Sequence, residues 1–467
     1  MDKFINRQEE LSTLEKEYMR SDSAFVVLYG RRRVGKTSLI SEFLRGRKNS
    51  LYFLATEESE VQNLKAFKEQ AADFMDNELL KTSVGADWTL IFKMLAAYKA
   101  ETKKIIVIDE FQYIGQSNPA FPSVIQKIWD TLLKDANVML IFCGSLVSMM
   151  KSQVLDYGSP LYGRRTSQIK LKQIEFKHYD AFFSGSKTAE ELLPYYAVTG
   201  GVPKYIEVFK PYDDIYKAIE ENILMRSSFL YEEPYFLLQR EVSEIGSYFS
   251  LIKAIAAGNR KLADIAAALG VQSTSLTKYL KVLTDLDLVE REVPITEEYP
   301  EKSKLGLYKI TDNYIAFWFK FVYPYRSNLE KGEIKHVLER IKKGFIQNYA
   351  SYVYESICRE KMWELARQGK FKFRFNKVGS YWGQKIGETD IVALDTAEKN
   401  IIVGECKYTS SPKGLEILHD LERKATALKE LTKSLTVQFI IFSTAGFSQG
   451  LTDAAKRNND IILIHKF

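Results

Sequence analysis

Short apolar runs recur in the first third of the chain, and polar residues or helical patterns separate them. The runs cover residues 24–29, 105–108 and 138–142. Unbroken apolar runs of this length are typical of strands that are buried on both faces of a parallel sheet. The residues after the first run predict a helix whose apolar positions are Leu39, Ile40, Phe43 and Leu44.

The middle of the chain has helical periodicity. Aromatic residues at helical spacing between residues 175 and 250 predict core positions of a helical region rather than a ligand site. Two helices are expected over residues 262–269 and 273–286, and two strands over 287–293 and 306–312. This order of elements predicts a winged helix-turn-helix.

The sequence leaves two interpretations open for this winged helix. Three polar residues that we expect to be exposed on its second helix could meet DNA, whereas nearby carboxylates keep the unit close to neutral. The polar residues are Ser275, Lys278 and Lys281, and the acidic ones are Asp264, Asp285, Asp287 and Glu290. The other interpretation, an internal platform, is what the family resemblance described below implies for this module.

Residues 313–340 have the pattern of a connector. The segment 314–330 is densely aromatic and lacks strict alternation, which predicts packing between domains. Residues 331–336 are then expected to form a linker.

The last part of the chain alternates between helical and strand patterns. Helices are expected over residues 344–367 and 418–431, and strands over 370–375, 388–395, 401–408 and 436–444. We expect Trp363 to face inward from the first helix. Phenylalanine alternates with lysine or arginine at 370–375, which predicts a half-buried strand with a basic outer face. Together these elements indicate an α/β domain.

The loop after the first strand has a complete G-x4-G-K-T pattern. Its glycines let backbone N–H groups surround phosphates, and the following helix N-terminus adds partial positive charge. Lys36 is expected to reach the β- and γ-phosphates of ATP, and Thr37 to offer its hydroxyl to Mg²⁺. The loop residues that we expect to bind ATP are Gly30, Arg31, Arg32, Arg33, Val34, Gly35, Lys36, Thr37 and Ser38.

Polar residues after the other two strands extend this nucleotide site. Asp109 is expected to hold Mg²⁺, and Glu110 to polarise the attacking water. Ser145 is a candidate sensor of the γ-phosphate, with a simple turn serine as the alternative. Arg164 and Arg165 follow a glycine in an expected turn. They could stabilise transition-state charge, in cis or on a neighbouring subunit of a homo-oligomer, or they are ordinary surface arginines.

These motifs resemble those of the archaeal-type P-loop ATPases of the AAA+/STAND group over roughly residues 2–310. The resemblance rests on FINRQEEL, GRRRVGKT, VIDEFQYI, CGS, LYGRR and VTGGVPKYI. It implies ATP hydrolysis, a helical lid after the ATPase core, and contact of Gly201 and Pro203 in the lid with the nucleotide. The chain departs from the family at Asn6, where many relatives have glycine, and so Arg7 is not assigned to the nucleotide.

Charge distinguishes the last domain from the rest of the chain. Residues 331–467 hold 23 Lys and Arg against 16 Asp and Glu, whereas residues 1–330 hold 43 against 44. The net charge of +6 therefore resides in the last domain. An excess of this kind suits a polyanionic partner such as DNA, although a solvated surface would also account for it.

Two carboxylates and a lysine lie in the predicted hairpin of this domain. Asp390 lies near the start of one strand, and Glu405 and Lys407 lie on the next. Residues two apart on a strand share a face, and the hairpin can bring Asp390 alongside them. Because charged residues are costly in a buried strand, they suggest a site. A surface hairpin with an ion pair between Asp390 and Lys407 is the alternative.

This D-x14-E-x-K arrangement resembles the PD-(D/E)xK nuclease superfamily over about residues 340–467. It also resembles the uncharacterised C-terminal domain that commonly follows these ATPases. The nuclease resemblance implies that Asp390 and Glu405 bind Mg²⁺ with help from Glu355, and that Lys407 orients the attacking water or stabilises phosphorane charge.

The nuclease resemblance also concerns Lys424 and Thr389. Lys424 on the following helix would approach the phosphate, and Thr389 stands where the motif name has proline. A nuclease fold that has lost its activity is a separate alternative.

Composition excludes several classes of protein. The sequence contains no run of eighteen apolar residues, the length that would suggest a membrane span, and its N-terminus lacks an apolar signal core. We therefore expect a cytoplasmic protein without membrane association. The three cysteines and four histidines are scattered, without the spacing of metal ligands or of a disulfide framework.

We therefore expect an α/β chain that binds and hydrolyses ATP, and whose nucleotide state controls a Mg²⁺-dependent nuclease-like domain acting on DNA. The alternative is an ATP-driven, non-cleaving switch that binds a partner protein or DNA. The expected parts are a P-loop ATPase core (1–172), a helical lid (173–248), a winged helix (249–312), the connector and linker (313–340) and a restriction-endonuclease-like domain (341–467).

Overall fold

The computed structural model describes residues 4–383 and 386–466 and divides into two compact units. The N-terminal unit consists of Met1–Ile174, Val202–Lys204 and Leu237–Ser243. The C-terminal unit consists of Glu175–Gly201, Tyr205–Phe236 and Glu244–Phe467. Within the described ranges, no helix is long and apolar enough to cross a membrane.

A five-stranded parallel sheet forms the centre of the N-terminal unit, with the strand order β2-β3-β4-β1-β5. The strands are β1 (Ala24–Tyr29), β2 (Ser50–Leu54), β3 (Lys104–Asp109), β4 (Val138–Gly144) and β5 (Ser167–Lys170). Every residue of β1, β3 and β4 is buried, as the apolar runs predict. Because β4 lies between β1 and β3, the carboxyl ends of these three strands meet at one edge of the sheet.

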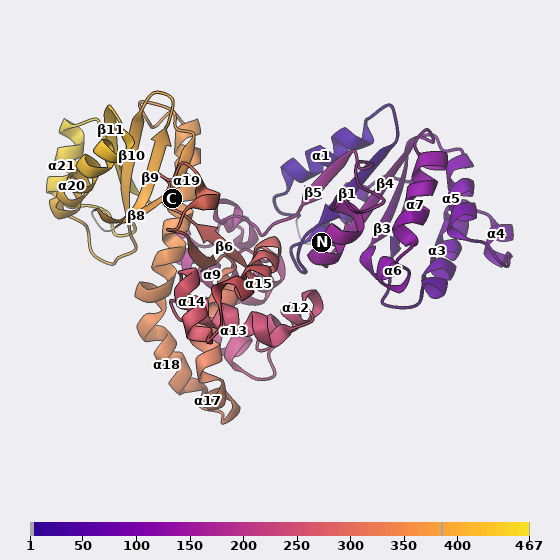
Figure 1. The fold of residues 1–467 in the computed structure, drawn as a ribbon, viewed down its shortest axis with the longest axis horizontal. Helices are drawn as coiled ribbons and strands as arrows, with labels where there is room; N and C mark the ends of the chain where they lie inside the picture. The colour runs from indigo at the N-terminus through magenta and orange to yellow at the C-terminus, as the bar shows by residue number, and fades with distance from the viewer. Residues whose placement is uncertain (1–3, 384–385, 467) are drawn as a thin grey trace. The chain divides into compact units, whose positions relative to one another are not determined.

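Helices cover both faces of this sheet (Figure 1). The α-helices of residues 4–174 are α1 (Gln8–Tyr18), α2 (Lys36–Leu44), α3 (Glu60–Phe74), α4 (Glu78–Thr82), α5 (Trp88–Ala97), α6 (Gln112–Ser117), α7 (Phe121–Ile128) and α8 (Val147–Met150). On one face, Leu14 of α1 and Phe43 of α2 pack in the core with Val26 of β1. On the other, Phe25 of β1 contacts Trp129, which follows α7.

The first part of the C-terminal unit is helical. Its elements include α9 (Ala189–Thr199), α11 (Ile215–Ile219), α13 (Ile245–Ala256), α14 (Leu262–Leu269) and α15 (Ser273–Asp285). The boundary between the two units divides α10 (Pro203–Phe209) and α12 (Glu233–Glu241). The strands β6 (Val289–Glu292) and β7 (Leu307–Ile310) follow and pair antiparallel. We call residues 289–310 the β6–β7 hairpin. The two helices and two strands predicted here from periodicity are all present.

The connector is helical rather than irregular. It contains α16 (Asn313–Phe317), a π-helical turn over Trp318–Val322, and α17 (Arg326–Glu330). The aromatic rings from Tyr314 to Phe321 are buried, with Trp318 only 1% exposed, whereas Tyr323 and Tyr325 are partly exposed. Packing of this segment between domains stays a prediction. The predicted linker at 331–336 is wrong in part, because α18 (Ile334–Phe345) already begins there.

A second five-stranded sheet forms the end of the C-terminal unit, in the order β12-β11-β10-β9-β8. Its strands are β8 (Lys377–Gly383), β9 (Gly387–Asp395), β10 (Asn400–Lys407), β11 (Thr436–Ser443) and β12 (Ile461–His465). The helix α19 (Ser351–Arg367) lies on one side, and α20 (Leu415–Thr432) and α21 (Gln449–Arg457) lie on the other (Figure 1). The β9–β10 hairpin of the sequence prediction is confirmed, with its turn at residues 396–399.

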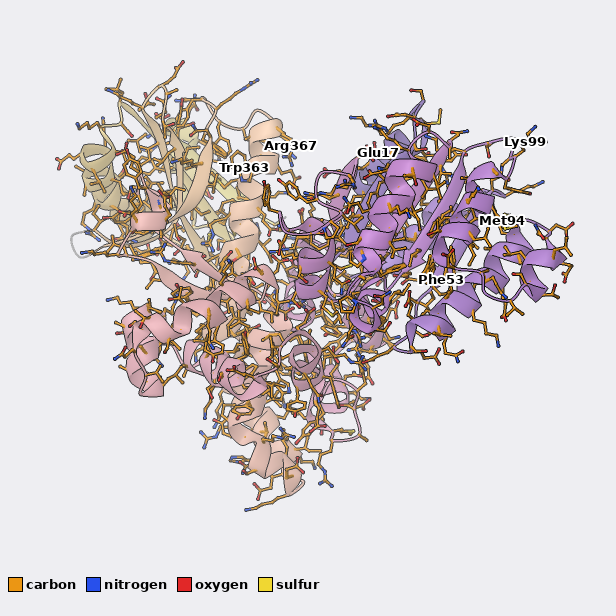
Figure 2. The ribbon with its side chains drawn as sticks, turned by 45° about the vertical axis from the view of Figure 1, so that its right-hand side comes forward. Glu17, Phe53, Met94, Lys99, Trp363 and Arg367 are labelled. Carbon is orange, nitrogen blue, oxygen red and sulfur yellow. The ribbon has the colours of Figure 1, made fainter. Side chains whose placement is uncertain are left out.

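Two details of this region differ from the sequence prediction. Residues 370–375 alternate as predicted, but they form no strand, because no neighbouring strand pairs with them; the Lys372 N–H instead donates to Gln438 Oε1 at 2.9 Å. The Trp363 side chain does not face inward but is 41% exposed near the end of α19 (Figure 2). Helical periodicity identified the helix but placed this residue on the wrong face.

We predict that Leu421→Ala lowers the free energy of unfolding of the C-terminal unit by about 2 to 5 kcal/mol. Leu421 lies on α20, is fully buried and belongs to the core between this helix and the sheet, so truncation leaves a cavity. Denaturant titration followed by circular dichroism measures the change. The matched control is Leu431→Ala on the same helix, where the side chain is 52% exposed; equal losses for the two variants would contradict the packing described.

Candidate functional site

The loop between β1 and α2 has a backbone that only certain residues can adopt. A Cβ at Gly30 would collide with the carbonyl oxygen of Leu171, which lies just beyond β5. Gly35 caps α2 with φ of 96°, in the left-handed region that favours glycine. Both glycines are therefore required for the loop geometry, independent of any ligand.

Lys36 lies inside the curve of this loop. Its side chain is buried, and its Nζ donates to the carbonyl oxygens of Gly30 at 2.8 Å and of Arg31 at 2.9 Å. Burial lowers the pKa of the Lys36 ammonium. Phosphate oxygens entering the loop would supply this buried cation with a counter-charge that the two carbonyl groups cannot provide.

Asp109, at the end of β3, lies beside the start of α2. Its Oδ2 accepts from Thr37 Oγ1 at 3.2 Å and from the Tyr52 hydroxyl at 2.6 Å, and its Oδ1 accepts from the Glu110 N–H at 2.8 Å. A hydroxyl and a carboxylate at this spacing are oxygen ligands of the kind that Mg²⁺ takes in phosphate sites. The residues therefore fit the ion that the sequence motif implies.

Glu110 is held by the turn after β4. Its Oε2 accepts from Ser145 Oγ at 2.7 Å and from the Ser145 N–H at 3.1 Å, and Gln112 Nε2 donates to the same oxygen. Ser145 thus touches the candidate catalytic carboxylate directly. A hydroxyl that left Glu110 for a γ-phosphate would free the carboxylate to act on water.

Three residues to which the sequence motifs assign no role make contacts in the nucleotide site. Tyr52 reaches Asp109 from β2, and burial and the Asp109 carboxylate raise the pKa of Tyr52, so its hydroxyl remains a donor. Gln112 lies two residues after Glu110 and is fully buried. Glu241 comes from a distant segment of the chain. Gln112 lies within the VIDEFQYI motif, which was the available signal for it; no local signal marks the other two.

Glu241 holds the N-terminus of α8. Its carboxylate accepts from the Val147 N–H at 3.2 Å, from the Ser148 N–H at 3.4 Å and from Ser148 Oγ at 3.0 Å. Burial nevertheless raises the pKa of Glu241, and Arg31 of the phosphate loop is among the groups that oppose this shift. The carboxylate is therefore linked to both the loop and the turn that follows Ser145.

The other loop arginines lie in distinct surroundings. Arg32 Nη2 donates to the Tyr113 hydroxyl at 2.7 Å, whereas Arg33 adopts a left-handed backbone with φ of 68°. Pro203 also lies near the loop, because a Cβ built at Gly35 would be 3.9 Å from its Cγ. Gly201 is left-handed, with φ of 70°.

Arg7 supports the phosphate loop from α1. Its Nη2 donates to the Val34 carbonyl at 3.1 Å and to the Lys172 carbonyl. Asn6 before it has φ of 63°, in the left-handed region where asparagine is the residue best tolerated after glycine. The departure from glycine at this position therefore preserves the backbone.

The two arginines of the LYGRR segment have different partners. Arg164 Nη2 lies 2.9 Å from Asp130 Oδ2, and its Nη1 donates to the Pro160 carbonyl at 2.8 Å. The Arg165 guanidinium lies 5.6 Å from the centroid of the Tyr162 ring. Asp130 and Pro160 therefore hold the Arg164 side chain, and a role of Arg164 or Arg165 at a nucleotide stays a prediction.

A second polar cluster lies on β9 and β10 of the C-terminal unit. The Cys406 N–H donates to Asp390 Oδ2 at 2.8 Å, which places Asp390 next to Glu405. Lys407 Nζ lies 2.7 Å from Glu405 Oε1, and Lys424 Nζ lies 3.3 Å from Glu405 Oε2. Lys407 therefore forms its ion pair with Glu405, not with Asp390 as in the surface-hairpin alternative.

The carboxylates of this cluster are crowded and buried. Burial and then the charge of Glu405 raise the pKa of Asp390. Burial and then the charge of Asp390 raise the pKa of Glu355 on α19. In the described ranges, no group of three or more histidine, cysteine, aspartate or glutamate side chains is arranged to hold a metal ion. Any metal here would therefore bind two carboxylates and complete its shell with backbone oxygens or water.

Comparison with known proteins places the chain in a family. Residues 4–209 match the family described as "ATPase domain predominantly from Archaea". Residues 318–423 match a family described as "Archaea bacterial proteins of unknown function", and this match includes Asp390, Glu405 and Lys407. The Walker-type ATPase PABY2304 of Pyrococcus abyssi has a similar fold, with a TM-score of 0.52 and 20% identity over 68% of this chain and 96% of that one.

Two proteins of Methanocaldococcus jannaschii are similar in sequence. The uncharacterized ATP-binding protein MJ0423 is 51% identical over 45 residues, which cover 10% of this chain and 76% of that protein. The uncharacterized protein MJECL04 is 38% identical over 406 residues, which cover 87% of each chain. The chain therefore belongs to the same family as MJECL04, and its first part is a P-loop ATPase domain of the type found predominantly in Archaea.

Proposed function

We propose that ATP hydrolysis by this chain controls a Mg²⁺-dependent nuclease that acts on DNA through the cluster on β9 and β10. The observation that carries the proposal is the placement of Asp390, Glu405 and Lys407 by two paired strands. The backbone N–H of Cys406 fixes Asp390, and Lys407 lies on the same strand face as Glu405. Two carboxylates and a lysine in this relation are what metal-assisted phosphodiester hydrolysis requires.

In the ATPase part, each residue of the loop region has a separate task. Lys36 binds the β- and γ-phosphates, Thr37 and Asp109 hold Mg²⁺, and Glu110 polarises the attacking water. The hydrogen bonds from Ser145 keep Glu110 away from water until a γ-phosphate competes for the serine hydroxyl. Arg165 supplies positive charge to the transition state, in cis or from another copy of the chain.

In the nuclease part, the two neighbouring carboxylates Asp390 and Glu405 suit a metal ion. Burial and then the charge of Glu405 raise the pKa of Asp390, and a divalent cation between the two carboxylates would offset their repulsion. When bound, Mg²⁺ would activate water and neutralise charge on the phosphate. Lys407 would then orient that water, and Lys424 would face the phosphate.

Two features make DNA the expected substrate: the positive charge of the last part of the chain, and the helices and hairpin that precede the nuclease part. The net positive charge of the chain lies in residues 331–467. The helices α14 and α15 and the β6–β7 hairpin have the order of a winged helix, a common DNA-associated module. Lys278 and Lys281 are exposed on α15, as the sequence analysis expects.

Control by the nucleotide has a physical route in α12. The first half of this helix belongs to the C-terminal unit, where buried Glu233 accepts from the Tyr205 hydroxyl at 2.9 Å. Its second half belongs to the N-terminal unit, where Glu241 caps α8 two residues after Ser145. Nucleotide-dependent movement of the turn at Ser145 would therefore pull on a helix that continues into the C-terminal unit.

A non-cleaving switch is the second candidate, and one observation favours it. Both oxygens of Glu405 are bound by ammonium groups, one from Lys407 and one from Lys424. If these lysines permanently replace a metal, the cluster is structural, and ATP controls binding of DNA or of a partner protein instead.

Lys36→Ala and Glu110→Gln are expected to separate ATP binding from hydrolysis. The first removes the ammonium from the phosphate loop and weakens ATP binding, whereas the second keeps binding but lowers the hydrolysis rate by about 100-fold or more. Fluorescent nucleotide titration and phosphate release measure the two effects. Undiminished hydrolysis in Glu110→Gln would show that another group acts on the water.

Asp390→Ala and Lys407→Ala are expected to abolish DNA cleavage and leave ATP hydrolysis unchanged, because they remove a metal ligand and the lysine that acts on water. The assay uses plasmid and single-stranded DNA with Mg²⁺ or Mn²⁺, with and without ATP. The control variants Asp453→Ala and Lys456→Ala remove an exposed acid and base that pair at 3.7 Å on α21. Absence of cleavage by the unmodified chain under every condition would favour the switch.

Glu241→Gln tests the proposed route of control. An amide NH₂ would face the N–H donors of α8, so the cap weakens and α12 loses its link to the turn after Ser145. We expect ATP binding to persist while the dependence of DNA binding or cleavage on ATP is lost. Glu57→Gln is the control, because Glu57 pairs with the neighbouring Arg240 at 2.8 Å without contacting α8. Equal nucleotide dependence in both variants would remove this route.

A further inference from the structure

We propose that the cavity beside Asp390 receives the terminal nucleotide of a single DNA strand, and that the β6–β7 hairpin forms one wall of this site. The inference rests on the proposed nuclease function and specifies the form of DNA that the site accepts. Three observations support the inference: the contact of the hairpin with the nuclease-like sheet, the residues that line the cavity, and the volume of the cavity.

The β6–β7 hairpin lies on the nuclease-like sheet. The Ile295 N–H donates to the Ser380 carbonyl at 3.0 Å, and Trp382 Nε1 donates to the Leu305 carbonyl at 3.1 Å. A Cβ at Gly379 would be 3.0 Å from Ile295 Cδ1, so the hairpin loop and β8 are in close contact. Because β8 is the edge strand next to β9, the hairpin covers the side of the sheet that leads to Asp390.

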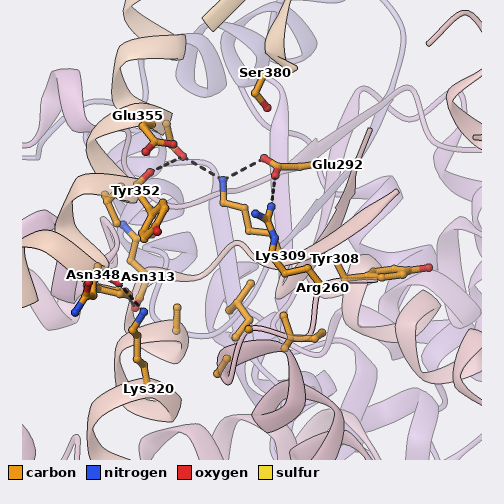
Figure 3. A pocket seen from close by; sticks show the side chains of 18 of the residues that line it. Arg260, Glu292, Tyr308, Lys309, Asn313, Lys320, Asn348, Tyr352, Glu355 and Ser380 are labelled. Carbon is orange, nitrogen blue, oxygen red and sulfur yellow. Dashed lines mark hydrogen bonds and ion pairs between the residues drawn. The ribbon is translucent and has the colours of Figure 1, made fainter. Parts of the chain in front are cut away.

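A cavity of about 340 Å³ lies between the hairpin, α19 and the start of β9. Asp390 and Glu355 line it together with Tyr308, Tyr352 and Trp382. Figure 3 shows Lys309 reaching from the hairpin toward α19, with Glu292 on one side and Glu355 on the other. The wall therefore combines aromatic rings, cations and the carboxylate assigned to the metal.

Polar contacts connect the hairpin to Asp390 across this cavity. Lys309 Nζ lies 3.2 Å from Glu292 Oε1 and donates to Ser356 Oγ at 3.1 Å. Arg359 Nη2 donates to the same Ser356 oxygen at 3.2 Å, and its Nη1 donates to the Asp390 carbonyl at 3.1 Å. This network fixes two cations between the hairpin and the strand that carries the cleavage site, where they can meet the phosphates of a bound strand.

The size of the cavity decides which form of DNA can enter. Its volume is in the range of small-molecule sites and suits one nucleotide, not a base pair in a duplex. Bases of a duplex are paired and stacked, whereas a base at the end of a single strand is free to stack on a tyrosine or tryptophan side chain. Tyr352 offers such a surface, since it is 56% exposed and lines the cavity. Hydrolysis there would add water across the last phosphodiester bond and release one mononucleotide.

Binding of DNA to the full-length chain tests the inference without requiring cleavage. A fluorescent single strand is titrated in Ca²⁺ with a non-hydrolysable ATP analogue present, and a duplex closed by loops at both ends is compared with it. We expect the single strand to bind at least about tenfold more tightly, and Tyr352→Ala to weaken its binding by about tenfold, because base stacking is lost. Tyr299→Ala is the matched control, since Tyr299 is 58% exposed but does not line the cavity.

Competition identifies the source of the bound nucleotide. If a free deoxynucleoside monophosphate displaces the strand and Tyr352→Ala weakens both, the cavity accepts the nucleotide unit from either source. If only oligonucleotides compete, the site requires a strand end. Equal binding of the strand and the closed duplex, or equal effects of Tyr352→Ala and Tyr299→Ala, would overturn the inference.

A parallel cleavage assay in Mg²⁺ distinguishes this inference from the proposed function. Strand binding that depends on Tyr352, with no cleavage of any DNA, would support the nucleotide site and refute the nuclease function. Cleavage of the closed duplex that depends on Asp390 but not on Tyr352 would support the nuclease function and refute the nucleotide site.

Discussion

Both candidate sites depend on the cost of holding charged side chains at the buried ends of apolar strands. An ionised group that leaves water requires opposite charge or hydrogen-bond donors nearby. At the end of β3, Asp109 is 2% exposed, and the hydroxyls of Thr37 and Tyr52 donate to it. On β10, Glu405 faces the ammonium groups of Lys407 and Lys424. Apolar residues would pack at these positions without such compensation, which is why both charged clusters are candidate sites.

The same requirement connects the nucleotide site to the rest of the chain. Glu241 is buried at the N-terminus of α8, where three donors face its carboxylate, and its helix α12 begins in the C-terminal unit. At the start of that helix, Glu233 is buried and bound by Tyr205. Each unit thus holds its own end of α12 through a buried carboxylate. The proposed control of DNA by ATP relies on this property.

Periodicity predicted the strands that are buried on two faces and the paired strands of the two hairpins, but it failed at residues 370–375, which no described strand pairs with. The strands β1, β3 and β4 lie close to the apolar runs, since no polar residue interrupts a strand that helices cover on both sides. At 370–375 the alternation is equally regular, yet a strand needs a neighbour to accept its backbone hydrogen bonds, and Gln438 provides a side chain instead. Within the nucleotide site, Tyr52 and Glu241 were missed because they approach from segments far from the motifs.

The sequence alone determined the phosphate-binding chemistry, because the glycines, Lys36 and Thr37 lie in one contiguous loop whose local geometry depends on few distant residues. It also identified Asp390, Glu405 and Lys407 as a group, from the two-residue period of paired strands. Only the tertiary structure decided that Lys407 pairs with Glu405, that Arg164 is occupied by Asp130, and that the β6–β7 hairpin lies on β8. These relations depend on strand register and on contacts between distant segments, which compete in energy and leave no local pattern in the sequence.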